Sequence, residues 1–144
     1  MADITAVLVD ANVLLDVMTQ DTHWFAWSAQ AIERVADQYR LVINPIVYAE
    51  VSIRYSRIED LDDALPKAMF DREPIPYEAA FLAGKAVFAY RRRGGTKSFP
   101  LPDFFIGAHA AVAGYSLMTR DAARYRAYFP KLSLIAPNGP STSR

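Results

Sequence analysis

Four acidic residues of this 144-residue chain lie in or beside apolar segments. They are Asp10, Glu50, Asp103 and Asp121. A carboxylate beside a hydrophobic core loses hydration unless a positive group compensates for it. A divalent cation held by all four acids would provide that compensation, and it would make the chain a metal-dependent hydrolase.

Each acid also has an ordinary structural explanation when it is considered alone. Asp10 could shape a turn, and Asp121 could cap a helix. Glu50 could pair with Arg54 four residues later, and Asp103 would be favoured at a helix N-terminus. These alternatives stay open for single residues, whereas the four acids together favour a shared site.

The charges of the chain are divided unevenly, although the net charge is zero. Residues 1–72 hold 6 Lys/Arg and 12 Asp/Glu, which gives a net charge of −6. Residues 73–144 hold 10 Lys/Arg and 4 Asp/Glu, which gives a net charge of +6. After Glu78 the only acids are Asp103 and Asp121. A basic half of this kind can steer a polyanion towards a small acidic centre.

The composition indicates one globular domain, which we place at residues 1–137, followed by a polar tail at 138–144. Hydrophobic residues make up 52% of the chain, and no apolar run reaches the roughly 20 residues that a membrane span needs. The N-terminus lacks a signal-peptide pattern, and the chain has no cysteine for disulfides or thiolate metal sites. We therefore expect a cytoplasmic protein.

Alternating strand and helix patterns predict an α/β sandwich around a mainly parallel sheet. Short apolar runs predict strands at 4–9, 41–43, 115–118 and 132–136. Helical spacing and helix-start signals predict helices at 13–19, 23–36, 45–55, 58–69, 77–92, 100–113 and 122–128.

The expected elements would bring the four acids to one edge of the sheet. Asp10 and Asp121 follow strands, while Glu50 and Asp103 lie in the first turns of helices. Sites in such folds gather at the carboxyl ends of the strands. Asn12 is the expected N-cap of the first helix.

The ordered motifs resemble the PIN domain family and, within it, VapC-like toxins of toxin–antitoxin pairs. The resemblance is carried by residues 9–16, 49–51, 101–110, 119–121 and 128–137. It implies a PIN-like three-layer sandwich with a central sheet of four to five strands flanked by helices.

The resemblance also implies a function and its residues. Asp10, Glu50, Asp103 and Asp121 would bind Mg²⁺ or Mn²⁺ and form the catalytic site, with Asn12 and Thr119 as supporting polar residues. The implied activity is that of an endoribonuclease. The implied partners are the RNA substrate, a second copy of the chain and a small antitoxin whose tail occupies the groove.

Basic and aromatic residues of the second half are candidates for contacting RNA. Arginines can hold the phosphate backbone, and tyrosines can stack on unpaired bases. The arginine candidates are Arg91, Arg92, Arg93, Arg120 and Arg124. Tyr90 and Tyr125 could stack or could be packing residues, and Arg91 to Arg93 could equally be a solvated helix end.

Two other functions remain as alternatives. The chain could be a PIN-like nuclease with another role in DNA or RNA processing, or a binding partner without enzymatic activity. A haloacid-dehalogenase phosphatase is disfavoured because Asn12 stands where that family needs a second aspartate.

Overall fold

Five parallel strands form one sheet in the computed structural model, which describes residues 5–94 and 101–137. The strands are β1 (Ala6–Val9), β2 (Arg40–Ile43), β3 (Phe70–Arg72), β4 (Ser116–Met118) and β5 (Leu134–Ile135). Their order is β3-β2-β1-β4-β5, and every neighbouring pair is parallel. The predicted parallel α/β architecture is confirmed, while the expected tail at 138–144 lies outside the described residues.

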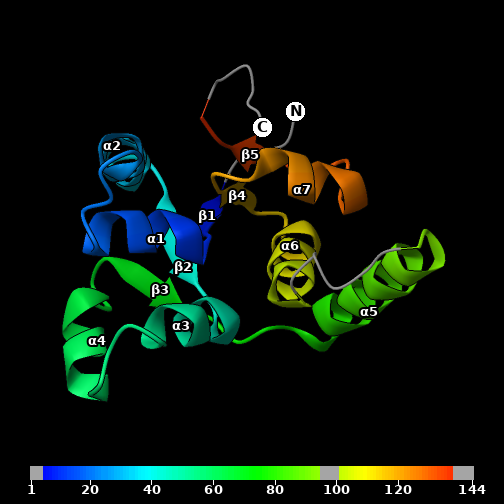
Figure 1. Ribbon diagram of the computed structural model, residues 1–144, viewed down its shortest axis with the longest axis horizontal. Helices are drawn as coiled ribbons and strands as arrows, with labels where there is room; N and C mark the ends of the chain where they lie inside the picture. The colour runs from blue at the N-terminus through cyan, green and yellow to red at the C-terminus, as the bar shows by residue number, and fades with distance from the viewer. Residues whose placement is uncertain (1–4, 95–100, 138–144) are drawn as a thin grey trace.

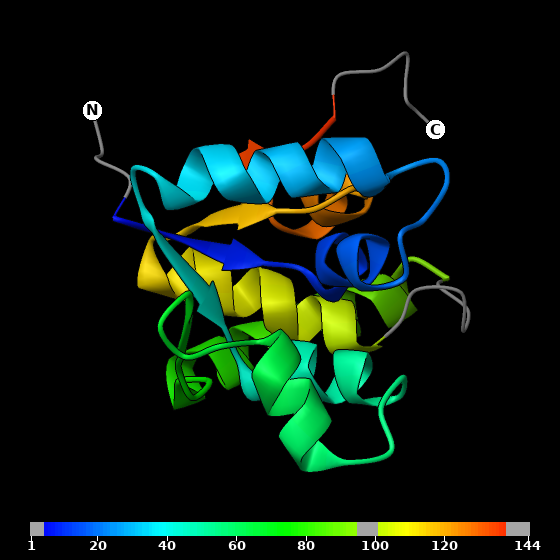
Figure 2. The ribbon, with the colours of Figure 1, turned by 90° about the vertical axis from the view of Figure 1, so that its left-hand side faces the viewer.

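Helices cover both faces of this sheet. They are α1 (Ala11–Met18), α2 (Phe25–Ala36), α3 (Pro45–Ser52), α4 (Ile58–Ala64), α5 (Tyr77–Arg92), α6 (Leu101–Ala113) and α7 (Ala122–Tyr128). Figures 1 and 2 show α2 on one side of the strands and α6, backed by α5, on the other. None of the described helices combines the length and the apolar character that crossing a membrane requires.

The core is built around the central strand, because β1 is covered on both faces. Its four residues, Ala6–Val9, are completely buried, as expected for an apolar strand inside a parallel sheet. Helix α6 approaches α7 closely at Gly107, where a Cβ atom would lie 2.5 Å from the Phe129 ring. The absent side chain therefore sets the spacing between two helices that carry candidate site residues.

Strand β3 was not predicted from the sequence, and the helix before it was predicted to be too long. Phe70–Arg72 is a short edge strand with two charged residues, so it lacks the apolar run that marks a buried strand. The helix predicted to reach residue 69 ends at Ala64. Leu65 leaves the helical region with φ −122° and ψ 69°, because a residue before proline, here Pro66, is disfavoured in the α conformation.

Two expectations about helix ends near the site were also wrong. Asp10, not Asn12, is the N-cap of α1, and its carboxylate accepts a hydrogen bond from the Ala11 backbone N–H. Glu50 lies in the second turn of α3, not the first, because the helix begins at Pro45. Asn44 caps that helix by accepting from the Val47 backbone N–H.

Candidate metal centre

The candidate acids gather at the carboxyl edge of the sheet, next to β1, where the order of the strands reverses. From β1 the chain moves to β2 on one side, and β4 later pairs with β1 on the other side. Asp10 follows β1, Thr119 follows β4, and Asn44 follows β2 and starts the helix that carries Glu50. A position between such strands is a common ligand site in parallel α/β folds.

Three of the four acids come together. Asp10, Glu50 and Asp103 each offer a carboxylate oxygen, and these atoms lie within 4.8 Å of one another. Asp10 and Asp103 are buried, with 3% and 6% of each residue exposed, and Glu50 is half-buried. The three side chains come from β1–α1, α3 and α6, so only the fold brings them together.

Burial and the proximity of these carboxylates make their ionised forms costly. Burial, together with the negative charge of Asp103, raises the pKa of Asp10 to about 6. Burial and the charges of Asp10 and Asp103 raise the pKa of Glu50 to about 7. Burial also raises the pKa of Asp103, although Arg124 opposes that effect. A cation would relieve the same repulsion.

Asp10 is held by donors on both oxygens. Its Oδ1 accepts from the Ala11 backbone N–H at 2.8 Å. Its Oδ2 accepts from the Thr119 hydroxyl at 2.8 Å, from the Tyr125 hydroxyl at 2.9 Å and from the Asn12 amide at 3.4 Å. Asn12 and Thr119 thus contact the acid that they were predicted to support.

Asp121 lies at the rim of this cluster and is not one of the three acids that converge. The Asn12 amide Nδ2 is 3.3 Å from its Oδ2, so one side chain joins Asp121 to Asp10. Its backbone N–H donates to the Thr119 hydroxyl at 3.1 Å. With 43% of its side chain exposed, Asp121 faces solvent more than Asp103 does.

Two of the arginine candidates are engaged by carboxylates. Arg124 donates from Nη1 to Asp103 Oδ2 at 2.7 Å, which places a positive charge at the edge of the acid cluster. Arg120 donates from Nε to the buried Asp16 at 2.7 Å, and its guanidinium lies 5.2 Å from the centre of the Trp24 ring.

The other three arginines lie at the end of α5. Arg91 and Arg92 belong to its last turn, and Arg93 is its C-cap. The guanidinium of Arg92 lies 5.7 Å from the Phe88 ring centre, and that of Arg93 lies 5.3 Å from the Tyr128 ring centre. All three are exposed, and their role in holding RNA stays a prediction.

The tyrosines have internal roles that the sequence did not reveal. Tyr125 is completely buried, so stacking on a base is excluded for it. Tyr90 packs edge-on against Phe104 and Tyr128. Aromatic residues at helical spacing usually indicate core packing, and nothing in that pattern shows that the Tyr125 hydroxyl reaches two acids.

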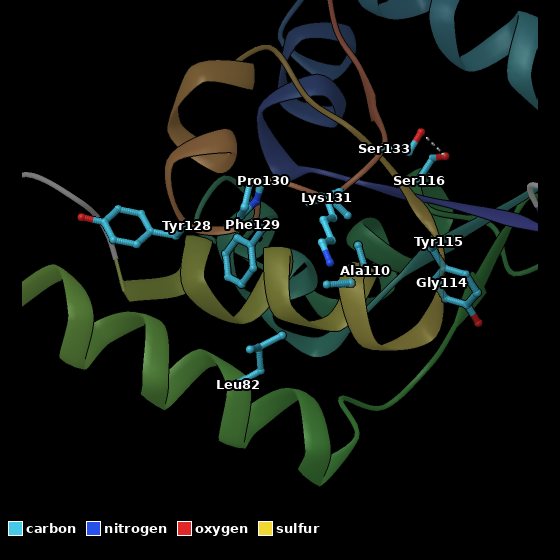
Figure 3. A pocket seen from close by; sticks show the side chains of 12 residues that line it. Leu82, Ala110, Gly114, Tyr115, Ser116, Tyr128, Phe129, Pro130, Lys131 and Ser133 are labelled. Atoms are coloured by element: carbon cyan, nitrogen blue, oxygen red, sulfur yellow. Dashed lines mark hydrogen bonds between the residues drawn. The ribbon is translucent and has the colours of Figure 1, made fainter. Parts of the chain in front are cut away.

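A separate groove opens at the opposite edge of the sheet and contains none of the four acids. It has a volume of about 480 Å³ and is lined by residues of α5, α6, β4 and the segment after α7. Figure 3 shows the Lys131 side chain in this groove, with the Ser116–Ser133 hydrogen bond at its margin. The groove is therefore distinct from the acid cluster.

The family of the chain follows from its sequence match. A family model of the PIN domain matches residues 7–130. The chain belongs to the PIN domain family. The match includes Asp10, Glu50, Asp103 and Asp121, and it confirms the resemblance inferred from the motifs.

Solved structures of similar fold include chains of VapBC complexes and of a toxin–antitoxin complex. VapBC2 from Rickettsia felis, bound to a promoter DNA fragment, matches with a TM-score of 0.70 and 17% identity over 92% of this chain and 98% of that one. VapBC-1 from nontypeable Haemophilus influenzae matches with a TM-score of 0.70 and 18% identity, over 92% of this chain and 98% of that one. A toxin–antitoxin complex from Klebsiella pneumoniae matches with a TM-score of 0.63 and 21% identity, over 92% of this chain and 98% of that one. A comparison with curated proteins found no match.

The acid cluster of this PIN domain fits a hard divalent cation. Its three converging side chains offer only carboxylate oxygens, which Mg²⁺ and Mn²⁺ prefer. Glu50 makes no hydrogen bond with any described residue, so its carboxylate is available as a ligand. Burial and the neighbouring acids raise the pKa values of Asp10 and Glu50, and the charge of a bound cation would oppose both effects.

The metal-free PIN domain should lose stability as the pH rises from about 5 to about 8. The pKa values of Asp10 (about 6) and Glu50 (about 7) lie above their unfolded values of 3.8 and 4.5. Their contribution to stability is therefore complete below about pH 4 and is lost as the pH passes through the folded values. Urea denaturation in EDTA at several pH values measures this loss, and Mn²⁺ should reverse it.

A Glu50→Gln variant isolates this effect from other titrating groups. Burial lowers the pKa of His109, which gives stability the opposite dependence on pH, but that contribution is common to both proteins. The variant should lose less stability than the wild type between pH 5 and pH 8. Equal losses in the two proteins would contradict the assignment of a raised pKa to Glu50.

Proposed function

We propose that this chain is a metal-dependent endoribonuclease and the toxin of a toxin–antitoxin pair. The observation that carries the proposal is the convergence of the Asp10, Glu50 and Asp103 carboxylates within 4.8 Å, in a chain that belongs to the PIN domain family. These acids lie close together, and not all of them have hydrogen-bond partners. Such a cluster suits a cation-dependent reaction on phosphate.

In this proposal the residues of the site have separate tasks. Asp10, Glu50 and Asp103 would hold Mg²⁺ or Mn²⁺, and Asp121 would complete the acidic site from the rim. A divalent ion there would supply the positive charge that activates water and stabilises the developing charge on the scissile phosphate. Asn12 and Thr119 would keep Asp10 in place through the hydrogen bonds described above.

The basic residues would bind the RNA backbone. Arg124 lies beside Asp103 with 37% of its side chain exposed, so it can face a phosphate next to the acid cluster. Arg91, Arg92 and Arg93 would bind more distant phosphates, consistent with the excess of bases over acids in residues 73–144.

The proposed protein partners are a small antitoxin and a second copy of the chain. Support for the antitoxin comes from the similar folds of toxins in the complexes from Rickettsia felis, Haemophilus influenzae and Klebsiella pneumoniae. Co-purification with the product of a neighbouring small reading frame would test the antitoxin, and light scattering of the isolated chain would test the dimer.

A cleavage assay tests the proposed activity. The purified protein is incubated with structured RNA and with single-stranded DNA of the same sequence, in Mg²⁺, in Mn²⁺ or in EDTA. We expect cleavage of RNA in either metal, with 5′-phosphate and 3′-hydroxyl ends, and none in EDTA. Cleavage of DNA alone would favour the DNA-processing alternative, and absence of metal-dependent cleavage would favour a binding protein.

A further inference from the structure

The buried hydroxyl of Tyr125 lies between two of the candidate metal ligands. Tyr125 belongs to α7 and is 0% exposed. Its oxygen is 2.9 Å from Asp10 Oδ2 and 3.3 Å from Asp103 Oδ1. Asp10 follows β1 and Asp103 lies in the first turn of α6, so this hydroxyl is a contact shared by three separate elements.

A phenol has one hydrogen, so it can donate to only one of these acids at a time. The shorter distance identifies Asp10 as the acceptor. Burial and the two neighbouring carboxylates raise the pKa of Tyr125 well above its usual value, so the group remains a donor at neutral pH. The hydroxyl thus satisfies one acid and limits how closely the other can approach.

The donors around the two acids are divided between their oxygens. Asp10 Oδ2 accepts from Tyr125, Thr119 and Asn12, whereas Oδ1 accepts only from the Ala11 backbone among the described residues. Asp103 Oδ2 accepts from Arg124 at 2.7 Å, and its Oδ1 has the longer contact with Tyr125. Each carboxylate is therefore fixed in rotation while retaining lone pairs for another ligand.

We propose that Tyr125 is a positioning residue that fixes the rotation and the separation of Asp10 and Asp103 for cation binding. The inference rests on the proposed metal site but adds a residue to it. Groups that orient ligands through hydrogen bonds typically change metal affinity by about 10- to 100-fold when they are removed. If Tyr125 acted only through packing, its ring and not its hydroxyl would determine the metal affinity.

The substitution Tyr125→Phe separates these two roles, because it keeps the ring and removes only the hydroxyl. We expect the Kd for Mn²⁺, measured by isothermal titration calorimetry, to rise by about 10-fold or more. In RNA cleavage, the Mn²⁺ concentration for half-maximal rate should rise in parallel, while the rate at saturating Mn²⁺ changes much less. Circular dichroism of the metal-free variant checks that the fold is kept.

Tyr115→Phe is the matched control. The Tyr115 hydroxyl also donates to a carboxylate, Glu73 Oε1 at 2.7 Å, but Tyr115 precedes β4 at the opposite edge of the sheet. Its Kd for Mn²⁺ should remain that of the wild type. A Tyr125→Phe protein with wild-type affinity would overturn the positioning role, and so would one that fails to fold.

The binding measurement also separates this inference from the proposed function. Wild-type protein that binds Mn²⁺ but cleaves no nucleic acid would overturn the nuclease proposal alone, since Tyr125 is tested by affinity. Wild-type protein that cleaves RNA but binds Mn²⁺ no better than Tyr125→Phe does would overturn the role of Tyr125 alone. Absence of Mn²⁺ binding by the wild type would overturn both.

Discussion

Replacing Asp10 or Asp103 by asparagine is expected to lower RNA cleavage by about 100-fold or more, because even groups that only orient metal ligands change activity by about 10- to 100-fold. Asparagine keeps the shape of the side chain but removes its charge. The variant cluster would therefore attract a divalent cation much less strongly. Initial rates in saturating Mg²⁺, with the same RNA for every variant, measure the loss.

The fold should survive both substitutions. The carboxylates are buried, and burial raises the pKa values of Asp10 and Asp103, so their charge does not favour the metal-free structure. Circular dichroism and urea denaturation in EDTA should therefore give a folded protein in each case. Glu50 makes no hydrogen bond with a described residue, so Glu50→Gln should be the least disturbed of the site variants.

Two further variants test whether the loss of RNA cleavage is specific to the acid cluster. Asp60→Asn removes an exposed acid from the first turn of α4, a helix that carries none of the cluster's three acids, and should leave cleavage unchanged. Asp121→Asn should reduce cleavage less than Asp10→Asn, because Asp121 is at the rim and outside the group of three. Full activity of purified Asp10→Asn or Asp103→Asn would refute the site.

The convergence of the acids could be predicted because each one is tied to the end of a regular element. Once a parallel sheet is inferred, the residues that directly follow its strands must lie at one edge, which places Asp10 and the β4–α7 segment together. Glu50 and Asp103 were predictable from helices that start at the same edge. Glu50 lies in the second turn of α3 and not in the predicted first turn, but α3 still brings it to that edge.

Contacts between distant side chains could not be predicted in the same way. Asp16 on α1 and its partner Arg120 are 104 positions apart, so no local sequence pattern links them. The sequence left Tyr125 open as a stacking or a packing residue, and only the tertiary structure shows its hydroxyl at Asp10. The short strand β3 was missed because an edge strand with Asp71 and Arg72 has no apolar periodicity.

The contact between Arg120 and Asp16 leads to the second large expected effect, on stability. Asp16 is 3% exposed, and its Oδ2 accepts from Arg120 Nε and from the Ser28 hydroxyl, each at 2.7 Å. Among the described residues, Arg120→Ala would leave this buried carboxylate with only the Ser28 hydroxyl as a partner. Breaking a buried ion pair costs about 3–5 kcal/mol.

We expect a somewhat smaller loss of about 2–3 kcal/mol in the free energy of unfolding, since solvent reaches part of Arg120 and weakens the pair. The exposed fraction of its side chain is 26%. Contact of the guanidinium with the Trp24 ring is included in this loss. Urea denaturation followed by circular dichroism measures it.

An exposed pair and a double variant test the physical cause. Arg57 and Glu59 are 3.5 Å apart with 64% and 66% of their side chains exposed, so Arg57→Ala should cost less than about 1 kcal/mol. Adding Asp16→Asn to Arg120→Ala removes the unpaired charge and should restore much of the stability. If the double variant is no more stable than Arg120→Ala, the cost does not come from the buried charge.

The same contact also bears on the metal centre, because Arg120 lies between Thr119 and Asp121. Its backbone N–H donates to Asn12 Oδ1 at 3.3 Å, while its side chain holds Asp16 on α1. Arg120 thus ties the β4–α7 segment to the helix that follows Asp10. Arg120→Ala should therefore weaken Mn²⁺ binding as well as stability, whereas a substitution with a purely global effect on stability would leave the affinity of the folded protein unchanged.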